Sequence, residues 1–511
     1  MSVYIESAEQ ARRSDQCAIQ EYGIPSLVLM EHAAGGCAEQ IRKLFPHPVP
    51  VLILAGPGNN GGDGLAIARL LDHAGWKQVR LFLPPESKMS PDEAVQARIV
   101  RRLGLTCTTE LSEALSWLQQ SELVVDALFG SGLSRPLGGD YAALVEAVNQ
   151  SPVPVVAIDI PSGLHGTSGE VMGTAIKAAY TFALDCIKEG ELIQQGPAHA
   201  GTIIPLDITI PEAIHQSVTW PARLLDASTA ASCLPARPND SYKGTFGKAL
   251  MIGGSSRMHG ALLMAALACE ESGIGTLTLF LPACIGDIAA MRMDEAMLLR
   301  APDQDGVFSD EAVAFFEKMG PSFTVISIGN GMQKGPSQQK LVDAVLQSDK
   351  PVVIDADAIE LAARSPYLKT RTAPFLITPH VGEMSQLTGI PIRQLEADPL
   401  PAIRSFLKTH PQGTLLFKSD SLWIGHGNEL FYFSHPNAAL AKGGSGDLLC
   451  GLCTALAGQS PDLFKDALAA VWLQSQAART DKDTACFGPQ DWLSRLPAAF
   501  KALRQKASHS H

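Results

Sequence analysis

The sequence lacks the basic stretches that bind nucleic acid. Charged residues make up 18% of its 511 positions, and the formal net charge is -12. A surface with this balance repels a phosphate backbone, and no run of lysine and arginine offsets it locally. We therefore expect no nucleic-acid partner. Small anionic ligands are not excluded, because backbone N–H groups at a helix N-terminus bind phosphate without a basic side chain.

Long apolar runs are missing as well. The segment 1–20 is polar and charged, without the apolar centre of an export signal. An uninterrupted apolar window of ~18 residues, which a membrane-spanning helix needs, does not occur. The ten cysteines show no regular spacing of a secreted disulfide framework, so we expect reduced thiols. The sequence thus predicts a cytoplasmic protein with no membrane contact.

The sequence is rich in what a globular α/β enzyme needs. Hydrophobic residues make up 46% of the chain, and 45 glycines and 34 prolines provide for many turns. At roughly 100–200 residues per domain, the length predicts at least two domains.

Short apolar runs alternate with segments of helical spacing in both halves of the chain. Because the runs are nearly all apolar, they are typical of strands buried on both faces of a parallel sheet. In the first half we expect strands at 49–55, 79–83, 123–127 and 153–158, and helices at 65–74, 91–103 and 141–150. In the second half we expect strands at 248–252, 276–281, 324–328, 351–354, 375–378 and 413–417, and helices at 261–271, 336–347 and 444–456.

A proline-rich, polar stretch near 215–240 interrupts this alternation. We place the junction of two domains there, with the first at 1–218 and the second at 225–505. Alternating strands and helices on either side predict the α/β class for both domains.

The segment 56–64 is the most informative of the first half. It reads Gly-Pro-Gly-Asn-Asn-Gly-Gly-Asp-Gly, follows an expected strand and precedes an expected helix. It has neither the Walker lysine nor the spacing of a dinucleotide fingerprint. Asn59, Asn60 and Asp63 instead offer side-chain oxygens beside bare backbone. A tight turn would explain one or two glycines. Five glycines in nine residues favour a loop that binds phosphate and ribose, or a cation.

Two further strand ends in this half carry polar side chains. Asp126 is followed by the glycine-rich segment 130–136, and Asp159 by Ser162. An aspartate after a strand is more often a helix cap than a ligand. Because carboxyl ends of parallel strands meet at one edge of a sheet, the three segments together predict a single ligand site.

The second half carries Gly443-Gly444-Ser445-Gly446-Asp447 directly before an apolar helix. Its N–H groups would form an anion site, and Asp447 in the first helical turn could accept a proton from a hydroxyl group next to the phosphates. Serine, glycine and aspartate are also residues that commonly cap helices. Polar groups at other strand ends, such as those of Asp355, His380 and Lys418, favour a phosphoryl-transfer site.

The first half resembles the NAD(P)H-hydrate epimerases, over about residues 1–215, and the resemblance implies a Rossmann-like parallel sheet. It also implies residue roles. Hydrated dinucleotide would be bound by Asn59, Asn60, Gly61, Gly62, Asp63, Gly130, Ser131, Gly132, Leu133, Ser134, Arg135, Pro136 and Asp159. Potassium would be bound by Asn60, Asp126 and Ser162. Asp159 is our candidate for the acid/base group, because inversion at C6 of the hydrate requires one. Lys188 falls in a Lys-Gly neighbourhood of the family, without an assigned role.

The second half resembles the ADP-dependent NAD(P)H-hydrate dehydratases, over about residues 225–500, and this implies a ribokinase-like α/β/α sandwich. Hydrated dinucleotide would be bound by Ala261, Gly331, His380 and Asp447. ADP would be bound by Lys418, Ser419, Asp420, Ser421, Leu422 and Gly446. The implied reaction begins with Asp447 activating the C6 hydroxyl group. Phosphate passes to that oxygen from ADP with Mg²⁺ present, and loss of phosphate yields NAD(P)H and AMP.

Two other interpretations compete with this one. A ribokinase-like small-molecule kinase fused to a dinucleotide-binding domain would explain the segment at 443–447, but less well the asparagines at 59 and 60. A nucleotide sensor without activity would not require Asp159 and Asp447. We expect the repair enzyme, acting on hydrated NADH and NADPH as a homo-oligomer.

Overall fold

The chain forms two compact units, with the boundary between Arg223 and Leu224. The computed structural model describes residues 2–217, 220, 222–434 and 437–508. Residue 218, where we expect the first domain to end, lies outside the described residues. Among those that are described, no helix is long and apolar enough to cross a membrane.

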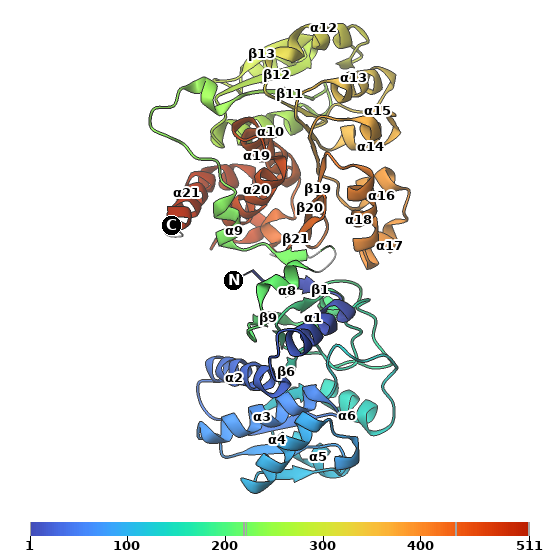
Figure 1. Cartoon of the computed structure of the whole chain (residues 1–511). Coiled ribbons are helices and arrows are strands. Elements are labelled where there is room, and N and C mark those ends of the chain that lie inside the picture. Colours follow the sequence, from blue (N-terminus) through green and yellow to red (C-terminus); the bar gives the residue numbers. More distant parts are fainter. Residues whose placement is uncertain (1, 218–219, 221, 435–436, 509–511) are drawn as a thin grey trace. The chain divides into compact units, whose positions relative to one another are not determined.

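The first unit contains a parallel sheet in the order β4-β3-β2-β5-β6-β7-β9 (Figure 1). Its strands are β2 (Val51–Ala55), β3 (Val79–Phe82), β4 (Thr106–Thr108), β5 (Leu123–Ala127), β6 (Val155–Ile158), β7 (Tyr180–Leu184) and β9 (Thr202–Leu206). All five residues of β2 and all five of β5 are buried, as expected for strands covered on both faces.

Helices cover both faces of this sheet. Because successive side chains point to opposite faces, Ile53 of β2 packs with α2, α3 and α4, whereas its neighbours Leu52 and Leu54 pack with α5 and α6. These helices are α2 (Ser26–Leu44), α3 (Asn59–His73), α4 (Pro91–Arg102), α5 (Leu111–Leu118) and α6 (Gly139–Gln150).

A smaller group of elements completes the unit. Strand β1 (Tyr4–Glu6) pairs in parallel with β8 (Ile187–Lys188) and antiparallel with β10 (Ala222–Leu224). Helices α1 (Ala8–Gln20), α7 (Gly196–Ala200) and α8 (Glu212–Gln216) accompany them. This pairing brings the two ends of the unit's sequence next to the segment that follows β7.

The second unit is built on a sheet in the order β13-β12-β11-β16-β17-β18-β19-β20-β21. It is parallel from β13 to β19, and β20 and β21 continue it antiparallel. The strands are β11 (Lys248–Ile252), β12 (Thr276–Pro282), β13 (Met297–Ala301), β16 (Val325–Ile328), β17 (Val352–Ile354), β18 (Phe375–Ile377), β19 (Gly413–Lys418), β20 (Leu422–His426) and β21 (Glu429–Phe433). A hairpin of β14 (Asp303–Gln304) and β15 (Val307–Phe308) stands apart.

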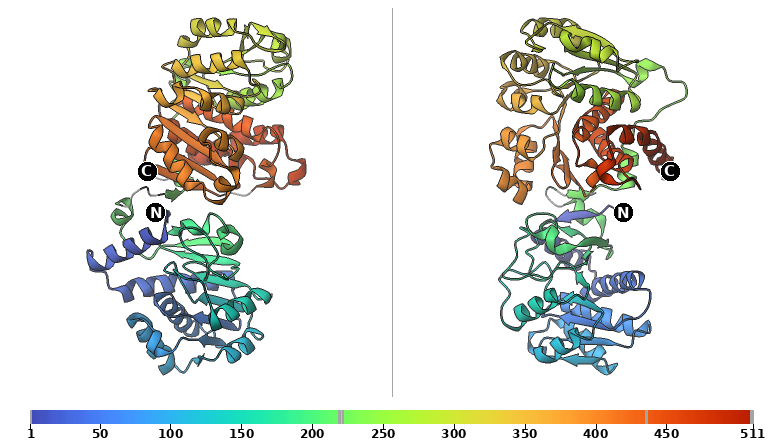
Figure 2. Two further views of the ribbon diagram at one scale, coloured as in Figure 1. Left: turned by 90° about the vertical axis from the view of Figure 1, so that its right-hand side faces the viewer. Right: turned by 180° about the vertical axis from the view of Figure 1, so that it is seen from behind.

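This second sheet lies between two helical layers, which Figures 1 and 2 show from several sides. One face carries α9 (Ala227–Ser232), α10 (His259–Glu271), α19 (Ser445–Gln459), α20 (Leu463–Ala477) and α21 (Pro489–Ser508), which share one apolar core. The other carries α13 (Pro336–Gln347), α14 (Asp357–Arg364), α16 (Val381–Thr388) and α18 (Leu400–Thr409). The remaining helices are α11 (Gly286–Ala290), α12 (Glu311–Met319), α15 (Tyr367–Thr370) and α17 (Ile392–Ala397). The predicted α/β class is confirmed for both halves.

Candidate active sites

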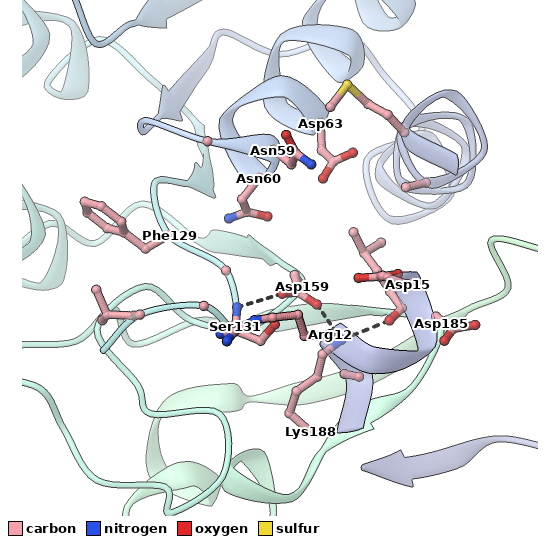
Figure 3. A pocket seen from close by; sticks show the side chains of 18 of the residues that line it. Arg12, Asp15, Asn59, Asn60, Asp63, Phe129, Ser131, Asp159, Asp185 and Lys188 are labelled. Carbon is pink, nitrogen blue, oxygen red and sulfur yellow. Dashed lines mark hydrogen bonds and ion pairs between the residues drawn. The ribbon is translucent and has the colours of Figure 1, made fainter. Parts of the chain in front are cut away.

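A cavity of about 620 Å³ lies at the carboxyl ends of β2, β5 and β6 in the first unit (Figure 3). Three polar strand-end segments meet in its wall, as the sequence predicts. Among the expected residues, those lining it are Asn59, Asn60, Asp63, Gly130, Ser131, Gly132, Leu133, Ser134, Arg135 and Asp159.

Gly61, Gly62 and Pro136 do not line this cavity. Because α3 already begins at Asn59, both glycines lie inside this helix, and they allow its first turns to pack closely against neighbouring groups. A Cβ atom at Gly61 would lie 1.9 Å from the carbonyl oxygen of Gly56, and one at Gly62 would lie 2.5 Å from the Cε of Met30. Residues 59–64 of the glycine-rich segment are therefore the start of α3, whereas we expect from the sequence a loop here and a helix only from residue 65.

The start of α3 is held by a buried carboxylate from the next helix. Glu93 of α4 accepts hydrogen bonds from the backbone N–H of Gly58 (2.8 Å) and of Ser90 (3.2 Å). The hydroxyl group of Ser90 donates to the side-chain oxygen of Asn59 (2.8 Å). These contacts fix the loop that precedes Asn60 through Glu93 and Ser90, which do not line the cavity.

Asp159 lies at the centre of the cavity wall with both carboxylate oxygens engaged. One accepts a hydrogen bond from the backbone N–H of Ser131 (2.8 Å), and the other forms an ion pair with Lys188 (Figure 3). Its backbone has a φ of +71°, which is rare for a residue with a side chain. Backbone strain of this kind is concentrated at functional sites.

Lys188 is 2% exposed, and its ammonium group also donates to the carbonyl oxygens of Leu184 (2.9 Å) and Cys186 (3.0 Å). Burial opposes its charge, but the carboxylate of Asp159 outweighs burial and raises the pKa of Lys188. Asp63, on the other side of the cavity, is 8% exposed. Burial raises its pKa well above the usual range, and the charges of Asp159 and Asp15 add to this effect.

The residues expected to bind potassium form a group beside the cavity. The side chain of Ser162 donates to the fully buried carboxylate of Asp126 (2.6 Å), and the backbone N–H of Ser162 donates to its other oxygen (2.8 Å). Burial raises the pKa of Asp126 to about 6, although the hydrogen bonds from Ser162 lower it. The carbonyl oxygen of Phe129 is next to the same hydroxyl group (3.1 Å). Such oxygen donors suit a hard cation.

Asn60, the third expected potassium ligand, lines the cavity at its inner end. With its amide nitrogen donating to the carbonyl oxygen of Ile158 (3.2 Å), its side-chain oxygen accepts from the backbone N–H of Gly130 (3.3 Å). This orientation leaves the second lone pair of that oxygen for a ligand. The residues present therefore fit a potassium ion.

In the second unit, Asp447 occupies the first turn of α19 and meets a network of strand-end residues. Its carboxylate accepts a hydrogen bond from the amide of Asn330 (2.8 Å), which also donates to Asp355 (3.0 Å). Burial raises the pKa of Asp447 to about 6, while the hydrogen bond from Asn330 lowers it. The side chain is thus a carboxylate at neutral pH that protonates readily in mildly acidic solution.

Lys418 connects this network to β19. Its ammonium group donates to Asp355 (3.1 Å), which also accepts from the hydroxyl group of Thr378 (2.5 Å). Burial opposes the lysine charge, but the carboxylates of Asp355 and Glu383 outweigh it and raise the pKa of Lys418. The ammonium group of Lys418 therefore lies beside the start of α19. Its nitrogen is 3.6 Å from the position that a Cβ atom at Gly446 would occupy.

His380 proves to be a helix cap. Its Nδ1 accepts from the backbone N–H groups of Gly382 (2.9 Å) and Glu383 (3.2 Å) at the start of α16. Burial and the charge of Lys418 lower its pKa, so the ring is neutral at pH 7. The ring is nevertheless exposed, and the residue lies beside Lys418 through a parallel bridge. It therefore caps a helix at the border of the site.

The remaining predicted residues fall around the same network. Gly331 packs closely against α10, because a Cβ atom there would lie 3.2 Å from the Cβ of Ala261. Leu422 begins β20, and the three residues before it form the turn of an antiparallel hairpin that the sequence reading did not anticipate. In this turn the hydroxyl group of Ser419 donates to the carbonyl oxygen of Ser421 (2.9 Å), and Asp420 is exposed.

Some functional roles could not be assigned from the sequence. Lys188, which has no role assigned from the sequence, and Asp185, which was not named there, line the first cavity, and Asn330 joins Asp355 to Asp447 in the second unit. A Cys-x-x-Cys spacing at Cys450 and 453 was also overlooked. The Sγ of Cys450 contacts the Asn330 oxygen at 3.2 Å, and all ten cysteines are free thiols. A polar residue at the end of an apolar run is the signal for both Asn330 and Asp185, which follow β16 and β7.

Comparison with known proteins gives matches to both units. Residues 26–190 match the family described as YjeF-related protein N-terminus, and residues 249–495 match the NAD(P)H-hydrate dehydratase family. The chain is 33% identical to the bifunctional NAD(P)H-hydrate repair enzyme Nnr of Moorella thermoacetica, over 99% of this chain and 98% of that protein. It is also 33% identical to the enzyme of the same name from Coxiella burnetii, over 92% and 93% of the two chains.

Among solved structures, the chain resembles an ADP/ATP-dependent NAD(P)H-hydrate dehydratase from Bacillus subtilis, co-crystallised with ATP and Mg²⁺. The identity is 28% and the TM-score 0.48, with 55% of this chain and 98% of that one covered.

Proposed function

This chain belongs to the family of bifunctional NAD(P)H-hydrate repair enzymes, and on this basis we propose how its two units divide the reaction. The first interconverts the R and S epimers at C6 of hydrated NADH and NADPH. The second dehydrates the S epimer to NAD(P)H with ADP, releasing AMP and phosphate. Full-length similarity to repair enzymes favours this function over a kinase fused to a dinucleotide-binding domain.

In the first unit, residues of the cavity wall bind the hydrated dinucleotide. The N–H groups at the start of α3, with Asn59 and Asn60, face its phosphates and ribose, and the segment 130–136 covers it. Asp159 exchanges protons with the substrate, and Lys188 holds its carboxylate in place through an ion pair. The observation that supports these roles is the convergence of all three strand-end segments on one cavity.

In the second unit, Asp447 accepts the proton of the C6 hydroxyl group as that oxygen takes the β-phosphoryl group of ADP. The bond between the two phosphates of ADP breaks, and AMP leaves. Loss of phosphate from C6 with a proton from C5 then forms the double bond of NAD(P)H. Gly446 and Lys418 bind the phosphates, the turn at 419–422 binds the nucleotide, and His380, Ala261 and Gly331 border the dinucleotide. The hydrogen-bonded chain Asp447–Asn330–Asp355–Lys418 supports this arrangement.

Two metal ions complete the proposal. Potassium is bound by Asn60, Asp126 and Ser162, where it offsets the negative charge of the buried carboxylate and of the substrate phosphates. Mg²⁺ accompanies ADP and neutralises charge that develops during phosphoryl transfer. If potassium binds the folded unit, K⁺ raises its unfolding temperature more than Na⁺ does, and Asp126→Asn removes the difference. An equal response of both proteins to K⁺ would contradict this site.

The nature of the substrates and the state of the cysteines also bear on the compartment of the protein. Because the substrates are nucleotides and the cysteines are free thiols, we place the protein in the cytoplasm. The homo-oligomer stays a prediction, which sedimentation of the purified chain tests.

The proposed function is tested by the NAD(P)H absorbance recovered from a mixture of both hydrate epimers with ADP, ATP or neither, in the presence of Mg²⁺ and K⁺. Complete recovery with ADP, and AMP as product, is the expected result. Recovery that stops when the S epimer is consumed would mean that the first unit is not an epimerase. No recovery with either nucleotide would contradict the dehydration assigned to the second unit.

A further inference from the structure

Two aspartates occupy the same unusual turn at neighbouring strand ends of the first unit. Asp159 follows β6 and has a φ of +71°, and Asp185 follows β7 and has a φ of +66°. In each turn the backbone N–H of the residue after the aspartate donates to the carbonyl oxygen of the residue before it. The distance is 2.9 Å from Ile160 to Ile158 and 2.8 Å from Cys186 to Leu184. Both are therefore γ-turns of the positive-φ kind, which are rare and strained.

Each strained aspartate is held by a buried cation. Lys188 binds Asp159, and His215 of α8 binds Asp185. His215 is 4% exposed and lies between two carboxylates. Its Nε2 is 3.3 Å from Asp185, and its Nδ1 is 2.8 Å from the fully buried Glu6 of β1. Strain of this kind persists only where the surroundings enforce it, and here the enforcing contact comes from His215.

The charges around His215 keep it protonated. Burial opposes the charge, but hydrogen bonds and Coulomb attraction from Asp185 and Glu6 outweigh burial and raise the pKa of His215 to about 10. The other titratable groups around it are Tyr4, whose ring stacks on the imidazole at 4.6 Å, and Glu212, which accepts from Tyr4. An imidazolium with both N–H groups used fixes two carboxylates at once.

The turn at Asp185 is what brings its two flanking carbonyl groups to Lys188. The oxygens of Leu184 and Cys186, one on each side of the turn, lie 2.9 and 3.0 Å from the lysine nitrogen. In an extended strand the carbonyl oxygens of two residues that are two positions apart would lie about 6.6 Å from each other, at a rise of about 3.3 Å per residue, which is too far for one ammonium group to contact both. The orientation of Asp185 therefore determines where the ammonium group lies, and that group binds Asp159.

We propose that His215 is a positioning residue of the epimerisation site. Through Asp185 it holds the turn whose carbonyl groups fix Lys188 against Asp159, and it does not touch the substrate. The proposal rests on the function proposed above for the first unit. Glu6 takes part by fixing the orientation of the imidazole ring, as a third group does behind a catalytic base.

Substitutions of Asp185 separate a backbone role from a chemical one. Glycine adopts a positive φ without strain, whereas alanine does not. Asp185→Gly should therefore keep most of the epimerisation kcat, and Asp185→Ala should lower it roughly 100-fold with little change in KM, because a displacement of about 1 Å is that costly. Thr209→Ala is a matched control, since Thr209 is another residue of the unit at positive φ (+72°). It should leave epimerisation unchanged.

The second experiment removes the His215 cation and then restores the turn at residue 185 with a glycine. Glu6→Gln with His215→Gln removes both buried charges together, so that neither is left unpaired. This double variant should lower the epimerisation kcat by about 10- to 100-fold, and adding Asp185→Gly should restore it. If the double variant lost epimerisation because it misfolded, adding Asp185→Gly would not restore that activity. Dehydration of the pure S epimer by the second unit normalises each preparation for the amount of enzyme.

The results separate a failure of the role proposed for His215 from a failure of the epimerase function proposed for the first unit. If Asp185→Gly is as inactive as Asp185→Ala, the carboxylate itself acts on the substrate and the proposal is wrong. Full epimerisation by the Glu6/His215 double variant overturns it as well. An unaltered chain that dehydrates the S epimer but never converts the R epimer would instead refute the function assigned to the first unit.

Discussion

At the scale of single residues, each site contains a carboxyl group that is held in place by one partner. Asp159 is paired with Lys188, whereas Asp63 faces the same cavity with no hydrogen bond recorded for its carboxyl group among the described residues. Two carboxyl groups in different surroundings therefore face one substrate, one paired with a cation and the other buried with a raised pKa. In the second unit, Asn330 plays the part of the partner for Asp447.

Replacing Asp447 by asparagine tests the proposed base. The amide keeps the size of the side chain but cannot accept the hydroxyl proton, so Asp447→Asn should lower the kcat of dehydration at least about 100-fold. Epimerisation should be unchanged. The assay follows NAD(P)H absorbance from the S epimer with ADP and Mg²⁺. Normal nucleotide-dependent turnover would exclude Asp447 as the base.

The pH dependence of dehydration follows from the same carboxyl group. Its pKa is raised to about 6, so it is protonated below that pH and ionised above it. Because a base must be ionised, kcat/KM, which reports the free enzyme, should rise with pH through about 6 and then level off. Asn330→Ala removes a hydrogen bond that lowers this pKa and should move the midpoint to higher pH. A midpoint that stays in place, measured by kcat/KM from pH 5 to 8, would contradict the role of Asn330.

At the scale of elements, buried strands could be predicted, but the start of a helix could not. The strands at 123–127 and 248–252 agree with β5 and β11 at both ends, because a run that is nearly all apolar is a strong signal for a strand in a parallel sheet. The helix expected from residue 65 begins at Asn59 instead, since packing against Gly56 and Met30 overrides the poor helix propensity of glycine. The γ-turn at Asp185 has no sequence signature, because it depends on His215.

The start of α19 offers a test at this scale. A Cβ atom at Gly446 would meet only the Lys418 ammonium group, at 3.6 Å, which is an ordinary contact. Gly446→Ala should therefore fold normally. Its methyl group would occupy the space for the phosphates of ADP and should raise the KM for ADP about tenfold or more. Gly260→Ala, where a Cβ atom meets nothing within 4 Å, should leave that KM unchanged. An unchanged KM in both variants would remove the anion site from the start of α19.

At the scale of the whole molecule, the sequence predicts two units from the proline-rich stretch near 215–240, and the structure divides at Arg223 and Leu224. The pairing of β1 with β8 and β10 could not be predicted, because it joins residues that are about 180 to 220 positions apart. A single sequence carries no signal for such contacts. His215 escaped notice for the same reason, since its partners Glu6 and Asp185 come from distant parts of the unit.

Each proposed site consists of residues from one unit only, and this predicts complementation between chains. Asp159→Asn should remove most epimerisation and leave dehydration intact, and Asp447→Asn should do the reverse. Either variant alone recovers NAD(P)H incompletely or not at all from a mixture of R and S hydrates. Mixed in equal amounts they should recover all of it, because the S hydrate released by one chain diffuses to the other. The absorbance at completion measures this, with the double variant as the matched control. If the mixture recovers no more than Asp159→Asn alone, the hydrate must pass between the two sites of a single chain.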